Sequence, residues 1–597
     1  MKKFTMLSSV LASALMLTVA SCSSEDVAGG DAQNGKGSTS YLAVNIENVG
    51  SAPASRAAYD QGTGSYEDGT TEESKINKVR FYFFNGDGTP YLLVKNKASQ
   101  KESVNYLDQD VTTDGNDHDQ TVETKTQAVL VLEGETKTVP ASVIAVINPD
   151  ALESTTLNNG RTMTLSELRT SATGKTFYDA TNGFVMSNSV YESAGQDVCS
   201  TPVANYVHAS SADALKNPVD IYVERVHAKV NAKIDADYVR TGETEKAWSK
   251  NSDGKYQINV GNIDVTTYDE NTNATPTTKT YPVYAVVQGW QVADANGKAE
   301  VCKQINTSWY AGELGISPWT TSDYHRCFWS KSVPFTQGAQ GGANHPVNPK
   351  FEDIKLSLTE DFSTTPVYTL PNTPTEVIAN PKTSLNYLTK LIVAAKLVYE
   401  DGNGSYKSAQ VCQYRGLTYL GEDAVKKQIA GGFTQYFKKS SDAGATVYKS
   451  LEASDIAFKT VAGSSSVKDY EVVATLASTV GELYVKKGET WTIVSKDDVN
   501  AALAKEEAQV RTDGDTYYYT PIKHLGSEGK LGEYGIVRNH SYQVTIQNIK
   551  GFGTPVYDPT KEIDPMIPSD DDTYLAARIN VLSWRVVSSK VNLDQTK

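Results

Sequence analysis

The densest group of possible metal ligands in this chain is Asp323-Tyr324-His325-Arg326-Cys327. A structural zinc site takes four ligands at recurring short spacings, and no second pair of ligands accompanies this group. The seven histidines are scattered along the sequence. The motifs H-E-x-x-H and G-x-S-x-G, which carry metal-dependent and serine-dependent hydrolysis, are absent from it. The sequence therefore predicts no enzyme, no catalytic residue, no metal site and no cofactor.

Nucleotides and nucleic acids are also disfavoured as ligands. Residues 30–36 nearly match a phosphate-binding loop, but Gly37 stands where Ser or Thr must bind magnesium, and no strand precedes the loop. The formal net charge is −15, whereas a surface that binds nucleic acid needs a basic patch. At 597 residues the chain is long enough for two or more domains.

The first cysteine, Cys22, gives a positive indication of where the protein is located. Cys22 ends the sequence Val19-Ala20-Ser21-Cys22, which follows two lysines and a short apolar run over residues 7–20. This arrangement resembles the lipobox of bacterial lipoproteins, in which the cysteine thiol takes a diacylglyceryl group. A multiply acylated cysteine anchors a chain firmly to a membrane. We therefore expect residues 1–21 to be a lipoprotein signal peptide and Cys22 to be lipidated.

The other four cysteines are too few for a disulfide framework in so long a chain. Cys302 and Cys327 could pair, or they could remain free thiols.

Short strand-like runs recur between turn signals, a pattern typical of β-sandwiches. These runs cover residues 41–46, 78–84, 128–132, 142–147, 281–288, 391–399, 471–477 and 541–549. Helices are predicted at residues 422–430 and 496–509, and a capping box at Thr164 opens a shorter one. The fold class is therefore mainly β, with two tandem β-sandwich domains and a few short helices.

Residues 219–234 read as one long strand, and we place the change of domain near it. One face of this strand is apolar and carries Val226, Ala228, Val230, Ala232 and Ile234. The other face carries Arg225, His227 and Lys229. These three side chains could form a ligand-binding face, or they could be the charged solvent side of an amphipathic strand.

Several stretches resemble the fimbrilins of Bacteroidales, specifically the major subunit family of the short (Mfa-type) fimbriae of the type V pilus. The stretches are I-Y-V-E-R-V-H-A-K-V at residues 221–230, D-Y-H-R-C-F-W at 323–329, the segment from Tyr534 to Pro559, and I-N-V-L-S-W-R-V-V-S-S-K-V-N-L at 579–593. The resemblance implies a transthyretin-like sandwich in each domain. It also implies a structural subunit of a cell-surface fimbria with a role in adhesion.

The family's assembly mechanism implies a cleavage site. Its subunits reach the outer membrane as lipoproteins, and an Arg-specific protease then removes an N-terminal segment that includes the first strand. Arg56 and Ala57 fit this cut, since they lie in a stretch of small residues. Residues 22–56 would be the removable propeptide, 57–225 the N-terminal domain and 226–597 the C-terminal domain. Removing a central strand exposes unpaired backbone groups and an apolar slot, which another chain's strand can fill.

The resemblance places the donor strand at the C-terminus. Val587, Val591 and Leu593 share one phase of the terminal run and would fill the slot in a neighbouring subunit. Leu582 and Val586 lie in the opposite phase, so either a bulge joins the two parts, or the first part pairs within its own sheet. The implied partners are other copies of the chain, accessory fimbrial subunits, the protease, and the outer membrane through the lipid.

A different class of function also fits the sequence. A monomeric, glycan-binding surface lipoprotein would have the same signal and β-sandwich style. It would need an aromatic platform and no donor strand.

Overall fold

The computed structural model describes most of the chain between residues 39 and 589. The described residues are 39–48, 70–97, 100–110, 125–152, 157, 159–173, 177–188, 191–193, 196–267, 277–305, 330–334, 346–378, 388–402, 404–442, 444–460, 470–524, 526, 528–563, 565, 574–582 and 587–589. Strands dominate them and helices are few and short, so the mainly β fold class is confirmed. Among the described helices, none combines the length and the hydropathy needed to span a bilayer.

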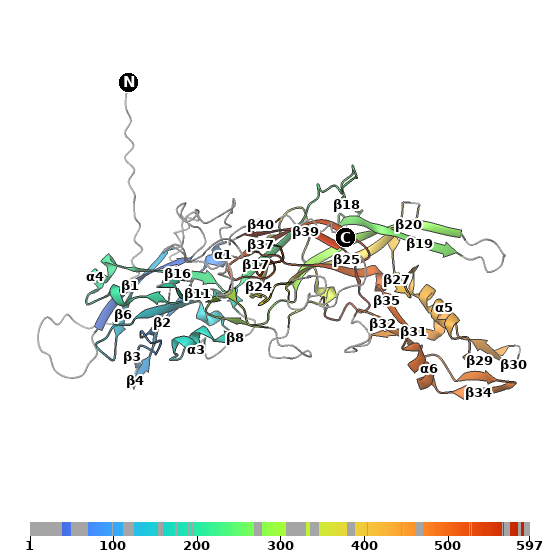
Figure 1. Ribbon diagram of the computed structural model, residues 1–597, viewed down its shortest axis with the longest axis horizontal. Coiled ribbons are helices and arrows are strands. Elements are labelled where there is room, and N and C mark those ends of the chain that lie inside the picture. Colours follow the sequence, from blue (N-terminus) through green and yellow to red (C-terminus); the bar gives the residue numbers. More distant parts are fainter. Residues whose placement is uncertain are drawn as a thin grey trace, which may run out of the picture.

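The first part of the chain forms a nine-stranded sheet (Figure 1). Its main path runs β15-β1-β16-β11-β7-β2-β5, with β14 paired to β7 and β6 paired to β1. The strands are β1 (Thr39–Asn48), β2 (Lys78–Phe84), β5 (Tyr106–Asp110), β6 (Lys125–Glu133), β7 (Ser142–Ile147), β11 (Met186–Asn188), β14 (Thr201–Pro202), β15 (Val207–His208) and β16 (Val219–Arg225).

Both faces of this sheet are buried in its middle. Phe81 and Phe83 of β2 pack into one apolar cluster, whereas Tyr82 and Phe84 pack into another on the opposite face. Because successive side chains of a strand point to opposite faces, a strand covered on both sides needs a continuous apolar run. The run in β7 has the same cause, and the predicted boundaries of β2 and β7 are confirmed.

The chain changes sheets at residues 226 and 227. The predicted long strand over residues 219–234 is therefore two strands, β16 in the nine-stranded sheet and β17 (Ala228–Ile234) in the next. The backbone turns away here because Val226 N–H donates to the carbonyl of Val185 and Asn539 N–H donates to that of His227. Residues before this turn therefore pair in the nine-stranded sheet, and residues after it pair in the five-stranded sheet.

Two further sheets face each other across the largest apolar cluster, as in a β-sandwich. The five-stranded one has the order β24 (Val367–Thr369), β17, β37 (Ser541–Lys550), β39 (Tyr574–Leu582), β40 (Val587–Ser589). The seven-stranded one has the order β18 (Trp248–Lys250), β19 (Tyr256–Thr267), β20 (Thr277–Ala293), β25 (Lys390–Glu400), β36 (Asp515–Pro521), β38 (Thr554–Pro555), with β26 (Tyr406–Ser408) on β25.

Residues 411–510 form an inserted unit between β25 and β36, which are neighbours in the seven-stranded sheet. Its five-stranded sheet has the order β28 (Leu417–Leu420), β27 (Val411–Tyr414), β35 (Glu507–Val510), β32 (Val472–Leu476), β31 (Ile456–Thr460). Its four-stranded sheet has the order β30 (Ala445–Ser450), β29 (Phe437–Asp442), β33 (Leu483–Lys487), β34 (Thr490–Val494). The unit has its own apolar core and lies at the opposite end of Figure 1 from β1.

The helices are α1 (Thr71–Ser74), α3 (Leu165–Arg169), α4 (Ser211–Lys216), α5 (Glu422–Gly432) and α6 (Lys496–Leu503). The capping box predicted at Thr164 opens α3, and Ser495 caps α6 as expected. The predicted helix over residues 496–509 is too long, because residues 507–510 pair as β35 with β27 and β32.

Short two-stranded ladders complete the fold. They are β3 (Leu93–Lys97) with β4 (Gln100–Val104), β8 (Ala172–Thr173) with β21 (Ala299–Glu300), β9 (Tyr178–Asp179) with β10 (Gly183–Phe184), β12 (Tyr191–Ser193) with β13 (Gln196–Val198), and β22 (Gln304–Ile305) with β23 (Ser330–Lys331).

Candidate polymerisation interface

The first strand of the chain is an interior strand of its sheet. Along one edge β1 pairs antiparallel with β6, from Thr39 opposite Glu133 to Glu47 opposite Lys125. Along the other edge it pairs antiparallel with β15 and then parallel with β16. The first residues of the described chain therefore complete a sheet whose other strands come later in the sequence.

Side chains of β1 are buried on both faces of the sheet. Leu42, Ala43 and Val44 have no exposed surface. Leu42 and Val44 pack in the cluster that also holds Leu130 and Ile221 from the two flanking strands. A fully buried aliphatic side chain contributes roughly 1.5–3 kcal/mol, so these side chains and the two backbone ladders hold β1 in place.

Loss of β1 would open a groove bounded by β6 and β16. Within the described residues, β6 pairs along its length with β1, and one isolated bridge between Leu93 and Gly134 lies just beyond its end. Both flanking strands would then present unpaired N–H and C=O groups beside an apolar floor. Such a groove can be filled by a strand from another chain.

The segment that follows the predicted cleavage site is held by a buried carboxylate. Glu73 of α1 accepts a hydrogen bond from the Tyr368 hydroxyl at 2.6 Å and pairs with the ammonium of Lys229 at 3.0 Å. Arg225 Nε donates to the Glu73 carbonyl at 2.6 Å, and Thr70 N–H donates to its carboxylate. One short helix thus joins β16, β17 and β24.

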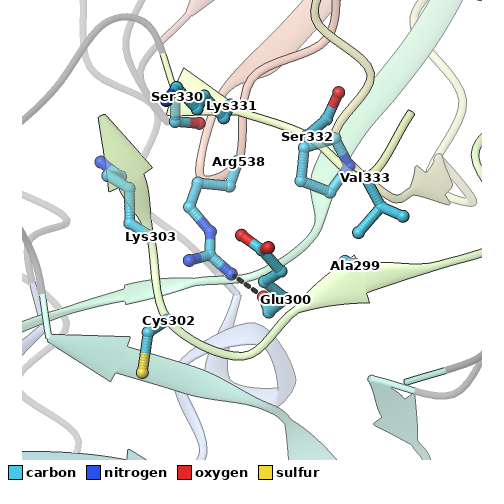
Figure 2. Close-up of a pocket in the computed structure, with 10 residues that line it drawn as sticks. Ala299, Glu300, Cys302, Lys303, Ser330, Lys331, Ser332, Val333 and Arg538 are labelled. Atoms are coloured by element: carbon cyan, nitrogen blue, oxygen red, sulfur yellow. Dashed lines mark hydrogen bonds between the residues drawn. The ribbon is translucent and has the colours of Figure 1, made fainter. Parts of the chain in front are cut away.

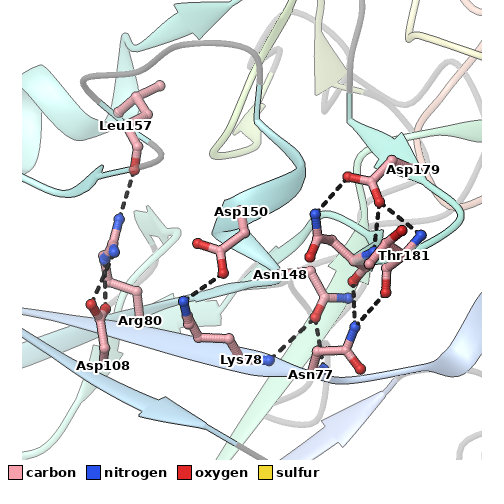
Figure 3. A network of polar contacts seen from close by, with 10 residues as sticks. Asn77, Lys78, Arg80, Asp108, Asn148, Asp150, Leu157, Asp179 and Thr181 are labelled. Atoms are coloured by element: carbon pink, nitrogen blue, oxygen red, sulfur yellow. Dashed lines mark hydrogen bonds and ion pairs between the residues drawn. The ribbon is translucent and has the colours of Figure 1, made fainter.

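An asparagine network fixes the next residues (Figure 3). Asn148, in the left-handed conformation at φ 51°, accepts from the N–H of Asn77 at 2.9 Å and donates to the carbonyls of Lys75 and Phe184. The Asn77 amide in turn donates to the Thr181 carbonyl at 2.9 Å. Residues 70–77 are therefore tied to the protein by contacts that do not involve β1.

The structure reverses one interpretation of the sequence. Arg225, His227 and Lys229 are buried, each no more than 6% exposed, so the solvent-side interpretation of their face is wrong. These side chains lie where the nine-stranded and five-stranded sheets meet, and Glu73 supplies the opposite charge. The sequence gives no sign of this, because Glu73 comes from a helix 156 positions before Lys229.

Most of the predicted site residues lie outside the described residues: Cys22, Arg56, Ala57, Val591 and Leu593. Val587 lies in β40 at the edge of the five-stranded sheet, opposite Val581 of β39. Residues up to Leu582 pair with β37 in the same sheet. In this structure, then, β39 and β40 pair within their own chain.

The cavity beside Arg538 is too small for a ligand (Figure 2). It measures about 10 Å³, room for one water molecule. Arg538 fills the site and donates to the carbonyls of Glu300 and Val301. Burial raises the pKa of the nearby Cys302 thiol to about 12, so it stays protonated. Elsewhere in the described ranges no three His, Cys, Asp or Glu residues gather as metal ligands do.

Stacked sheets and an interior first strand define the class of fold, a β-sandwich protein. Residues 510–590, which span β36 to β40, match the family model "Major fimbrial subunit protein type IV, Fimbrillin, C-terminal". Residues 510–590 are thus similar to the C-terminal part of a fimbrillin, a major fimbrial subunit protein. That family is structural and non-enzymatic.

The likeness of the chain to individual known proteins is more distant than its match to this family model. No curated protein matches the chain by sequence. A candidate cell adhesion protein from Bacteroides eggerthii is 11% identical, with a TM-score of 0.32, over 93% of this chain and 98% of its own. One from Parabacteroides distasonis is 12% identical, with a TM-score of 0.33, over 92% and 97%. The tip fimbrial protein Mfa3 from Porphyromonas gingivalis, truncated at its C-terminus, is 10% identical, with a TM-score of 0.30, over 91% and 99%.

Proposed function

We propose that this chain is a polymerising fimbrial subunit that is assembled by exchange of β1 for a strand of another subunit. The position of β1 carries the proposal, since it is the interior strand between β6 and β16. The precursor is lipidated at Cys22 and anchored in the outer membrane until an Arg-specific protease cuts between Arg56 and Ala57. The mature subunit then joins the extracellular fimbria and contributes to adhesion.

The anchoring of residues 70–77 supports a cut at Arg56. This arginine lies between the end of β1 at Asn48 and the start of the anchored segment at Thr70. Cutting there would separate β1 from α1, while Glu73 and Asn148 keep the new N-terminal segment attached. We keep the domain division at residues 225 and 226 as part of this proposal.

The donor is the C-terminal end of the chain. Residues beyond Ser589 would enter the groove of the next subunit, with Val591 and Leu593 on its apolar floor. If Val587 also takes part, the pairing of β40 with β39 must open. Among the described residues that ladder is short and joins Val587–Ser589 to β39, so opening it would cost little compared with the gain of the longer β1 groove.

An Arg56→Ala variant tests the proposal, with Arg161→Ala as an exposed arginine control. N-terminal sequencing of fimbriae from the parent and the control should begin at Ala57. The Arg56→Ala chain should keep β1 and should give no ladder on an unboiled gel. Polymers of the parent chain that begin at Cys22 would show that β1 is retained, and the exchange mechanism would be wrong.

Electron microscopy of sheared surface material separates this function from that of a monomeric glycan-binding lipoprotein. Filaments labelled by antibody against the chain are expected. A chain found only as a monomer would favour the second function.

A further inference from the structure

An unusual cluster of rings lies on the four-stranded sheet of the inserted unit. The ring centroids of Tyr448 and Trp491 are 3.9 Å apart and the rings nearly parallel, at 12°. Phe437 meets Trp491 edge-on at 4.9 Å, and Tyr484 meets Tyr448 at 5.1 Å. We call the side of β29, β30, β33 and β34 that carries these rings the aromatic face.

The aromatic face is not part of the core of the inserted unit. Leu483 and Val494, on the opposite side of the sheet, pack into that core. On the aromatic face Phe437, Tyr448 and Trp491 are only half-buried. Ile493, which pairs with Tyr484 and so shares this face, is 61% exposed. A group of large apolar side chains left open to water is typical of a binding surface.

The charge of this sheet opposes that of the whole chain. Residues 437–450 and 482–494 contain five lysines and three acidic residues, Asp442, Glu482 and Glu489, in a chain of net charge −15. The Glu482 carboxylate accepts a hydrogen bond from the Tyr484 hydroxyl at 2.8 Å. In the strand register, Lys439 lies directly opposite Tyr448 and Lys486 directly opposite Trp491. Residues opposite each other point to the same side of a sheet, so both lysines share the aromatic face.

Both of these lysines have exposed side chains. The Lys486 ammonium lies 5.9 Å from the centre of the Trp491 ring. Its acidic neighbour Glu489 is 4.0 Å away and almost fully exposed, a distance at which a surface ion pair is weak. In contrast, Lys438 is paired with Asp455 at 2.7 Å. Lys439 and Lys486 are therefore the cations that a ligand on the aromatic face would meet.

We propose that the aromatic face binds an acidic polysaccharide. Aromatic rings offer a flat apolar surface for the C–H face of a sugar ring, and the lysines bind carboxylate or sulfate groups. A single-stranded nucleic acid also stacks on rings, but it binds along a continuous basic groove in which successive bases stack on aromatic side chains. Here the rings form one contiguous cluster with two lysines beside it, an arrangement that suits sugar rings with charged substituents.

The inference goes beyond the fimbrial function, and it does not depend on polymerisation. The aromatic face lies at the far end of the molecule from the β1 groove (Figure 1), so an unpolymerised chain would present it as well. Loss of binding and loss of assembly are thus separate results.

Chromatography of the purified, unpolymerised full chain tests the proposal. The probes are immobilised heparin, a sulfopropyl resin that has charge without the sulfated polysaccharide, and immobilised dextran as a neutral sugar polymer. The chain should be retained by heparin, elute later in a sodium chloride gradient than from the sulfopropyl resin, and pass through dextran. Failure of heparin to retain it, or equal retention on both charged resins, would overturn the proposal.

Variants locate the site. Trp491→Ala keeps the charge and should weaken heparin binding about tenfold, the size expected for loss of one stacked ring. Tyr406→Ala, a tyrosine of β26 that is 47% exposed, is its control and should bind as the parent does. Lys486→Glu should abolish retention, whereas Lys216→Glu in α4 makes the same charge change on an exposed side chain and should not.

Two results would contradict the site. Retention unchanged in both Trp491→Ala and Lys486→Glu would place binding elsewhere. Tighter binding of oligo(dT) than of heparin would show a nucleic-acid surface instead. Lys439→Glu separates loss of binding from a folding defect in Trp491→Ala. Because the Lys439 side chain is exposed, this variant should lose heparin binding while its thermal melt stays unchanged.

Discussion

The Tyr368 hydroxyl donates a 2.6 Å hydrogen bond to the carboxylate of Glu73, and this contact joins β24 to the short helix after the predicted cleavage site. Burial alone would raise the pKa of Glu73, but the charge of Lys229 and the hydrogen bonds from Tyr368 and Thr70 lower it below its ordinary value. Glu73 is therefore ionised at neutral pH, and its charge holds Lys229 in a buried position. The segment after Arg56 is a structural part of the junction between the sheets.

Glu73→Gln should destabilise the protein strongly. The variant keeps the shape of the side chain but leaves the Lys229 ammonium buried without a counter-charge, which typically costs about 3–5 kcal/mol. Urea unfolding at pH 7 measures the loss. Glu72→Gln, at the exposed neighbouring position, is the matched control and should change the unfolding free energy little. Lys229→Met combined with Glu73→Gln should recover part of the loss, and a double variant no more stable than Glu73→Gln would contradict the ion-pair explanation.

Mild acid should weaken the same junction through His227. Burial, with a smaller effect from the charge of Arg538, lowers the pKa of His227 to about 3. Below pH 6.5 the unfolded chain takes up a proton that the folded chain does not, so stability is lost as the pH falls from about 6.5 towards 3. At pH 5 the contribution of this group is about 2 kcal/mol less favourable than at pH 8.

Unfolding free energies at pH 5 and pH 8 check this prediction. His227→Phe places an apolar ring among Phe177, Phe184 and Tyr368. This variant should lack the part of the stability difference between pH 5 and pH 8 that comes from His227. His208→Phe on β15, a half-buried histidine, should keep it. An equal difference in the parent and in His227→Phe would mean that His227 is not the group responsible.

Cys22→Ala should abolish lipidation. The prediction comes from the lipobox around Cys22, since only the thiol can form the thioether to the diacylglyceryl group. Labelling of cells with a clickable fatty acid should mark the parent precursor and a Ser23→Ala control but not Cys22→Ala, and surface fimbriae should fall in the variant. A Cys22→Ala chain that still takes the label would disprove the assignment.

Val591→Asp should weaken assembly without unfolding the subunit. In the proposed exchange, Val591 sits on the apolar floor of the next subunit's groove, and an unpaired charge there is costly. Asn592→Asp adds the same charge at the neighbouring position, which points to the opposite face, and should assemble normally. Unboiled gels report the result, with a ladder expected for the control and chiefly monomer for Val591→Asp.

Truncation after Ser589 separates the donor segment from β40. It removes Val591 and Leu593 and should leave a folded, exported and processed monomer that cannot extend a fibre. If this shortened chain still forms ladders, the donor strand lies elsewhere. If it fails to fold, the segment belongs to the core of its own sheet.

The sequence by itself determined several of the longer elements. A strand-like run closed by a turn predicted β2 to the residue. A continuous apolar run predicted β7 to the residue, because a strand covered on both faces is largely apolar. The capping box at Thr164 predicted α3, because those hydrogen bonds are local. Local signals failed at residues 507–510, where pairing with β27 and β32 prevailed over a helical pattern.

Only the tertiary structure decided which strands are neighbours and which charges are buried. Alternation marked residues 41–46 as a strand, but the position of β1 between β6 and β16 depends on pairing with strands distant in sequence. Lys229 looks like a solvent-facing lysine in its own strand, and it is buried because Glu73 reaches it from α1. The aromatic face escaped prediction for the same reason, since its rings come from four strands that meet only in the folded sheet. Periodicity reflects which side chains of a segment are buried, whereas the strand that pairs with that segment is set by long-range packing.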